Sequence, residues 1–283
     1  MLTTRRPEWL QKKVSPSLHL DMDRLLLDLN LHTVCREANC PNITECYGSN
    51  RATFLILGTA CTRLCSFCSV TKKEPLPPDP GEPERVAEAI VRLRLAHLVI
   101  TSPTRDDLPD GGADSFVRTV AAIRRVSPQT GIELLIPDFL GDGESIAKVV
   151  NARPDIVGHN LETVPRLYHI RQGADYLRSL EVLRLLHELD PELKTKSGIM
   201  LGLGETPDEV VNLFRDLMAV GCRYLSIGQY LAPGRKQYPV QSYIRPELFT
   251  LYKEQALAIG FQHVESGPYV RSSFNAERYS DDR

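Results

Sequence analysis

Residues 52–68, ATFLILGTACTRLCSFC, join an apolar run to three closely spaced cysteines. The run ends at Gly58 and contains a β-branched residue and an aromatic one, which is typical of a buried strand. Cys61, Cys65 and Cys68 follow at once, so we expect all three thiols in the loop directly after a first strand.

Five further strand-like runs alternate with helix-like stretches along the chain. The runs are HLVITS (97–102), GIELLIP (131–137), DIVGHN (155–160), KTKSGIML (194–201) and RYLSIGQY (223–230). The stretches between them carry apolar residues at helical spacing, such as Val86, Ile90 and Leu93. Strands that alternate with crossover helices pair in parallel, and their carboxyl ends carry the chemistry. We predict an α/β fold, a partial (β/α)6 TIM-like barrel, with an open doubly wound sheet as the alternative.

The βα repeat is absent near both ends of the chain. We therefore expect one compact unit in three segments: an N-terminal extension (1–50), the barrel (51–265) and a C-terminal tail (266–283). One predicted helix has especially clear end signals, an N-cap, a first-turn proline, a capping-box glutamate and a terminal glycine. These signals are Thr206, Pro207, Glu209 and Gly221.

The composition excludes several classes of protein. A chain of 283 residues with 42% hydrophobic and 25% charged residues can bury a large core without disulfide bridges. Its formal net charge of −2 gives no general attraction to polyanions. The chain shows no leader-like segment and no apolar run of about 18 residues. We expect a cytoplasmic protein that binds neither membrane nor nucleic acid.

Six of the seven cysteines form two triplets with different spacings. We call Cys61, Cys65 and Cys68 the loop triplet, and a second group within the extension, Cys35, Cys40 and Cys46, the extension triplet. Clustered thiols in a reducing compartment are more often metal ligands than disulfides. A structural zinc site takes four ligands, which two triplets do not supply, whereas three thiolates on an iron-sulfur cubane leave one iron for another ligand. Zinc and disulfides remain the alternatives.

The loop triplet has the spacing CxxxCxxC, and after the first strand of a βα repeat it resembles the radical S-adenosylmethionine (SAM) superfamily. The resemblance implies a 4Fe-4S cluster on these three cysteines, with SAM chelated by the open iron. It also implies a 5′-deoxyadenosyl radical that takes hydrogen from unactivated carbon. Phe67, one place before the third cysteine, matches the aromatic residue that lies beside the adenine in that superfamily.

The extension triplet, spaced CxxxxCxxxxxC, is more discriminating. Together with RSSF (271–274) it resembles the lipoyl synthase family, whose segments appear here in the same order as NCPNITECY, TRDDLPDGGA, HNLETVPRLY, GIMLGLGET and GQYLAPG. The resemblance implies an auxiliary 4Fe-4S cluster held by the extension triplet and Ser273. It gives Ser273 a catalytic role as the releasable ligand of a sulfur-donating cluster, because a serine oxygen binds iron more weakly than a thiolate.

The implied reaction inserts two sulfur atoms into an octanoyl chain to give the lipoyl cofactor. The octanoyl group is carried on a lysine of a lipoyl carrier protein or domain, each of two SAM molecules supplies one radical, and a ferredoxin or flavodoxin delivers electrons. Two other classes remain open. One is a methylthiotransferase-like radical enzyme, for which we would expect an added basic domain, and the other is a non-enzymatic iron-sulfur carrier.

Further SAM contacts are expected at the strand ends. Gly202 and Gly204 follow the fifth predicted strand, where the backbone can approach a cofactor, although a simple glycine turn is the alternative. His159, Asn160 and Glu162 follow the fourth strand, and a histidine there can equally be a structural group.

The sequence departs from the family pattern in two places. Phe274 replaces the usual tyrosine, so any hydrogen bond from that hydroxyl is missing. The tract GRKQYPVQSY (234–243) also differs, which leaves the substrate contacts of that loop undefined. Neither change affects an expected iron ligand.

Overall fold

The computed structural model of the protein describes residues 6–11 and 20–279. Within these residues eight strands form one sheet, in which each strand pairs with the next along the chain. All neighbouring pairs are parallel except the first, which is antiparallel. The strands are β1 (His32–Thr33), β2 (Thr53–Leu55), β3 (His97–Thr101), β4 (Gly131–Leu135), β5 (Ile156–Gly158), β6 (Lys194–Leu201), β7 (Tyr224–Gln229) and β8 (His263–Gly267).

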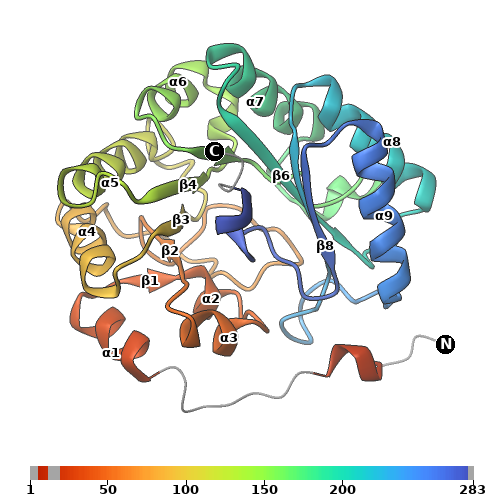
Figure 1. The fold of residues 1–283 in the computed structure, drawn as a ribbon, viewed down its shortest axis with the longest axis horizontal. Helices are drawn as coiled ribbons and strands as arrows, with labels where there is room; N and C mark the ends of the chain where they lie inside the picture. The colour runs from red at the N-terminus through yellow and green to blue at the C-terminus, as the bar shows by residue number, and fades with distance from the viewer. Residues whose placement is uncertain (1–5, 12–19, 280–283) are drawn as a thin grey trace.

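Long helices follow each of the strands β2 to β7 and form a ring around the sheet (Figure 1). Their inner faces join the strands in one large hydrophobic core, in which Val86, Phe116 and Leu213 are fully buried. None of the helices within the described ranges is long and apolar enough to cross a membrane. The ring consists of α4 (Glu82–Leu93), α5 (Ala113–Val126), α6 (Gly143–Asn151), α7 (Tyr176–Leu189), α8 (Pro207–Ala219) and α9 (Pro246–Ile259).

The six predicted strands are confirmed as β2 to β7, and the partial barrel is confirmed because β1 and β8 form the two edges of an open sheet. Two strands were not predicted. β1 has only two residues, too few for a pattern. β8 reads HVESG, in which Glu265 and Ser266 interrupt any apolar run.

The extension is helical, and the tail lies inside the ring of helices, at the dark blue centre of Figure 1. In the extension, Met22 and Leu26 of α1 enter the core. β8 crosses the predicted start of the tail at residue 266, and residues 1–5 and 280–283 of the predicted segments lie outside the described residues. The remaining elements are η1 (Glu8–Leu10), α1 (Leu20–Asp28), α2 (Val34–Glu37), α3 (Ile43–Gly48), η3 (Phe139–Gly141), η4 (Pro165–Ile170) and η5 (Ala276–Tyr279).

Parallel pairing gathers the carboxyl ends of the strands β2 to β8 at one end of the barrel, which we call the barrel mouth. The loop triplet follows β2 at this end, and Asp138 follows β4. The predicted residues Asn160 and Glu162 follow β5, so segments far apart in the sequence meet there.

The predicted end signals of α8 are confirmed. Thr206 Oγ1 accepts a hydrogen bond from the Glu209 amide at 3.4 Å, and the Glu209 carboxylate accepts one from the Thr206 amide at 2.8 Å. Pro207 is the first helical residue, and Gly221 follows the helix with a φ of +82°.

We predict that Thr206→Ala lowers the free energy of unfolding by about 1 kcal/mol, because an amide at the start of α8 loses its acceptor. Urea unfolding of the apoprotein measures the change. Thr250→Ala, at an exposed position within α9, is the matched control and should not destabilise, since alanine has the higher helix propensity. Equal stability of Thr206→Ala and wild type would contradict a stabilising role of the capping box.

Candidate active site

The loop triplet is held at the barrel mouth by hydrogen bonds from its loop to three other segments. Ser66 donates its amide to the Ile170 carbonyl at 2.8 Å, and its own carbonyl accepts from the Tyr238 amide at 2.8 Å. Ser69 Oγ donates to the carbonyl of Glu37 in α2 at 2.6 Å. The loop is therefore fixed both to the barrel and to the extension that carries the other cysteines.

The thiols of the loop triplet lie close enough to interact electrostatically. Burial raises the pKa of Cys65 and of Cys68, and the Cys61 thiol raises the pKa of both further. The positive charge of Lys72 opposes the rise at both cysteines, and that of Arg171 opposes it at Cys65. A bound metal reverses this balance, because its positive charge stabilises thiolates.

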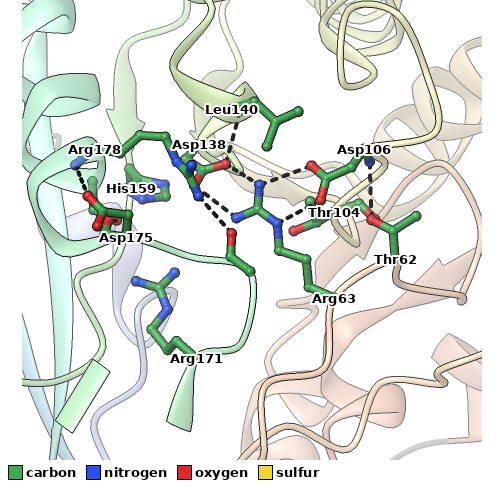
Figure 2. Close-up of polar contacts among 12 residues, drawn as sticks. Thr62, Arg63, Thr104, Asp106, Asp138, Leu140, His159, Arg171, Asp175 and Arg178 are labelled. Atoms are coloured by element: carbon green, nitrogen blue, oxygen red, sulfur yellow. Dashed lines mark hydrogen bonds and ion pairs between the residues drawn. The ribbon is translucent and has the colours of Figure 1, made fainter. Parts of the chain in front are cut away.

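Arg63 lies between the first two cysteines of the loop triplet and binds two carboxylates (Figure 2). Its Nη1 and Nη2 donate to Asp138 at 2.8 and 2.5 Å, and its Nε and Nη2 donate to Asp106 at 2.8 and 2.9 Å. Arg178 of α7 also donates to Asp138, at 2.8 Å. Burial would raise the pKa of Asp138, but the hydrogen bonds and charge of Arg63 outweigh it and hold that pKa well below its usual range. The two cations balance the two carboxylates, and Arg63 fixes the loop to the segments after β3 and β4.

A cavity of about 140 Å³ lies beside this network and is lined by Arg63 and Asp138. Three buried atoms of its lining residues have no hydrogen-bond partner among the described residues: Ser102 Oγ, His159 Nε2 and Arg171 Nε. Burial lowers the pKa of His159 to about 4, so the ring is neutral at pH 7. Buried polar groups without partners are costly, so these atoms indicate a site for a polar ligand.

The predicted residues Asn160 and Glu162 line the same cavity. Asn160 Nδ2 donates to Glu162 Oε1 at 3.0 Å and to Ser272 Oγ of the tail at 2.6 Å. Burial raises the pKa of Glu162, while the nearby Arg171 opposes the rise. Cys65 is within electrostatic range of both Arg171 and Glu162, which places the loop triplet beside this cavity.

The structure brings the extension triplet together with Ser273. Cys35 in α2, Cys46 in α3 and Cys40 between the two helices line one pocket with Thr53 and Ser273. Burial raises the pKa of Cys35 to about 12, and the Cys40 and Cys46 thiols add to the rise. All four ligands that the resemblance implied for the auxiliary cluster therefore border one pocket.

Ser273 itself is held by a side chain of the barrel. Thr53 Oγ1, at the start of β2, donates to Ser273 Oγ at 2.6 Å. Two residues further along the tail, the Asn275 Oδ1 atom accepts from Arg51 Nη1 at 3.0 Å. Asn42 of the extension also donates its Nδ2 to the Tyr269 carbonyl of the tail at 2.6 Å, and the extension and the tail together form one wall of the site.

A larger cavity, of about 410 Å³, lies beside the extension triplet. Cys35, Cys40 and Ser273 line it on one side, and Asn160 and Glu162 line both this cavity and the smaller one. Arg63 of the cysteine loop lines the smaller cavity and Cys35, Cys40 and Ser273 line the larger one, so the two cavities are neighbours that share lining residues. Apolar side chains supply much of the remaining lining, among them Leu135, Ile199, Met200, Leu231 and Val270.

The other predicted SAM contacts have a structural explanation. Gly202 and Gly204 have φ of +94° and +111°, a region that strains other residues. A Cβ at Gly202 would lie 2.3 Å from both Gln229 Nε2 and the Ser242 carbonyl oxygen, so packing within the protein already requires glycine. Neither glycine lines the two cavities at the mouth, and Phe67 packs partly buried against the core. Contact of these three residues with SAM stays a prediction.

Several residues of the site were not predicted from the sequence, among them Thr53, Arg63, Arg171 and Ser272. Arg63 could have been found, because a cation inside a cysteine loop requires a carboxylate nearby, and Asp138 follows a neighbouring strand. Thr53 is the first residue of β2, whereas functional residues were expected at the carboxyl ends of the strands. No local sequence pattern indicates its contact with the tail.

Both triplets fit the clusters that the resemblance implied. All seven cysteines are free thiols. Within residues 6–11 and 20–279 no three His, Cys, Asp or Glu side chains are grouped so that they could hold a single metal ion. A cubane instead distributes its thiolates over different irons. The loop triplet combines three thiols with an adjacent polar cavity, and the extension triplet combines three thiols with a serine hydroxyl.

Comparison with known proteins agrees with this geometry. The model of the radical SAM superfamily matches residues 55–217. The lipoyl synthase of Geotalea uraniireducens (strain Rf4) is 69% identical over 279 residues and covers 99% of each chain. The lipoyl synthase of Caldicellulosiruptor saccharolyticus is 52% identical, with 98% of each chain covered.

Solved structures share the fold at low sequence identity. SuiB of Streptococcus suis, bound to S-adenosylmethionine, matches with a TM-score of 0.60 at 13% identity, over 87% of this chain and 59% of that one. Methylornithine synthase (PylB) matches with a TM-score of 0.54 at 14% identity, over 86% and 81% of the two chains. These matches concern the fold alone, whereas the curated relatives match over nearly full length. The chain belongs to the lipoyl synthase family of the radical SAM superfamily.

Proposed function

We propose that the protein inserts two sulfur atoms into an octanoyl chain on a lipoyl carrier protein or domain, giving the lipoyl cofactor. The loop triplet would hold the cluster that binds SAM, and the extension triplet with Ser273 would hold the auxiliary cluster. One observation carries the proposal: Asn160 and Glu162 line both the cavity beside Arg63 of the cysteine loop and the cavity bordered by Cys35, Cys40 and Ser273, so the two cavities are neighbours.

When bound, the first cluster and SAM supply a radical that takes hydrogen from unactivated carbon, and the auxiliary cluster supplies sulfide. The protein's own residues position the reactants and exclude water. Arg63 and its carboxylates keep the cysteine loop rigid. His159 is neutral, so its Nε2 can accept a hydrogen bond from SAM, while the Arg171 Nε–H can donate one.

The larger cavity suits an octanoyl chain. Its lining combines apolar side chains, such as Met200 and Leu231, with polar and charged ones, among them Asn160, Glu162 and Arg271. An apolar wall favours burial of the alkyl chain, and it keeps water away from a reactive carbon radical.

Ser273 is suited to be a ligand that leaves. Its oxygen is a weaker partner for iron than the three thiolates. The hydroxyl of Thr53, 2.6 Å away, can hold the serine after it leaves, because it is already within hydrogen-bond distance.

Three further parts of the proposal concern partners and place. The octanoylated carrier would dock at the barrel mouth, where the larger cavity lies. A ferredoxin or flavodoxin would supply the electrons, and the protein would work in the cytoplasm, where thiols stay reduced.

We predict that the anaerobically reconstituted wild-type protein binds about eight irons per chain and that Cys35→Ala and Cys61→Ala bind about four each. Cys61→Ala should form no 5′-deoxyadenosine. Cys35→Ala should still form it from SAM but should add no sulfur to an octanoyl-lysyl peptide, as followed by mass spectrometry.

Cys222→Ala is the matched control, since Cys222 is buried outside both triplets, and it should keep about eight irons and full sulfur insertion. Formation of the doubly sulfurated peptide by Cys35→Ala would contradict the proposal.

We predict that Arg63→Lys slows formation of 5′-deoxyadenosine by at least about tenfold, because an ammonium cannot reproduce the forked hydrogen bonds to Asp138 and Asp106. The free energy of unfolding should fall by about 1–3 kcal/mol. Arg118→Lys, which alters an exposed ion pair with Asp114, is the control and should change neither quantity measurably. A wild-type rate in Arg63→Lys would show that the loop does not depend on this network.

A further inference from the structure

The C-terminal tail passes through the interior of the barrel. It leaves β8 at Gly267 and then lies inside the ring of helices (Figure 1). The Val270 carbonyl approaches β7 so closely that a Cβ added to Gly228 would lie 2.1 Å from its oxygen. A Cβ added to Gly198 of β6 would lie 2.8 Å from the oxygen of Ser272.

Two glycines of the barrel wall therefore make room for the tail. Neither Gly198 nor Gly228 has a positive φ, so the backbone there could carry a side chain without strain. At Gly228 every close neighbour of an added Cβ belongs to the tail, whereas at Gly198 the Cβ would lie equally close, at 2.8 Å, to Ser272 Oγ of the tail and to Asn160 Oδ1 and Ser226 Oγ of the barrel. The barrel interior is shaped to hold this segment.

The last described residue, Tyr279, anchors the tail near the amino ends of the strands. Its side chain is 0% exposed, and its hydroxyl donates to the Leu225 carbonyl at 3.2 Å. The Lys196 ammonium lies 3.9 Å from the centre of the Tyr279 ring and donates to Glu133 at 2.8 Å. Lys194 Nζ donates to the Tyr279 carbonyl at 2.8 Å, so side chain and backbone are both held.

The surroundings of this anchor differ from those of Ser273. Tyr279 is fixed by a buried ion pair, a cation-π contact and hydrogen bonds, whereas the Ser273 side chain has a hydrogen bond to Thr53. Only five residues lie between the two positions. An anchor at Tyr279 therefore limits how far Ser273 can move when its own contact breaks.

We propose that Tyr279 is a positioning residue, which fixes the tail inside the barrel so that Ser273 stays beside the extension triplet. The proposal rests on the proposed function for the part that concerns the auxiliary cluster. The anchoring of the tail stands on the contacts alone. Ser273 could then dissociate from iron and still stay near the extension triplet, because Tyr279 holds the chain that carries it.

Hydrogen exchange of the apoprotein, followed by mass spectrometry, tests the anchor. We expect Tyr279→Ala to raise the exchange rate of tail amides 268–279 by at least about tenfold, with β3 to β7 unchanged. Tyr279→Phe keeps the ring over Lys196 and should protect the tail nearly as well as wild type. Tyr252→Ala removes a comparable aromatic side chain from α9 and should leave exchange in the tail unchanged. Wild-type protection in Tyr279→Ala overturns the proposal.

A second pair of variants tests the same idea from the barrel wall. Gly228→Ala should displace the tail and speed its exchange as Tyr279→Ala does, whereas Gly143→Ala, with open space around the added Cβ, should not. Tail protection unchanged in Gly228→Ala counts against the proposal.

Single-turnover sulfur insertion by the reconstituted protein then separates anchoring from function. We expect Tyr279→Ala to form 5′-deoxyadenosine at the wild-type rate but to sulfurate the peptide at least about tenfold more slowly than wild type. Tyr279→Phe should sulfurate the peptide at nearly the wild-type rate. If Tyr279→Ala shows fast exchange in the tail but sulfurates the peptide at the wild-type rate, the positioning role is overturned. If Ser273→Ala itself sulfurates the peptide normally, the ligand assignment of the proposed function fails, while the exchange data still decide the anchor.

Discussion

The open edge of the sheet is the constraint on which the site depends. Because β1 and β8 are both edge strands, the barrel wall does not close on itself, and the chain's own ends complete the structure. The tail contacts β2 through Ser273 on one side and β7 through Val270 on the other. The extension packs against the same opening and bonds to the tail through Asn42, whose Nδ2 donates to the Tyr269 carbonyl at 2.6 Å. The pocket of the extension triplet exists only because both ends of the chain meet there.

Buried charge is balanced at both ends of the barrel. At the mouth, Arg63 joins the cysteine loop to Asp138, a carboxylate that is only 1% exposed. Deeper in the barrel, Lys196 pairs with Glu133 beneath the tail. Burying such a pair costs desolvation free energy, and in return the pair can fix the geometry around it. Here the Arg63 pair fixes the loop that carries one cysteine triplet, and the Lys196 pair fixes the tail that reaches the other.

The repeating elements follow from local sequence, and the ends of the chain do not. Apolar runs predicted β2 to β7, and the cysteine spacings grouped Cys35, Cys40 and Cys46, which border one pocket. β8 was missed because Glu265 and Ser266 break its pattern. The position of the tail depends on contacts between residues far apart, such as Gly228 with Val270, for which a single sequence carries no periodic signal. The same reason hides Thr53, whose partner is 220 residues away.

The proposed function requires that each cysteine triplet hold its own iron-sulfur cluster. Crystals of the anaerobically reconstituted protein, measured at the iron absorption edge, test it most directly. The account predicts two separate anomalous peaks, one beside Cys61, Cys65 and Cys68 and one beside Cys35, Cys40, Cys46 and Ser273. A single peak, or a second one away from Ser273, would contradict it.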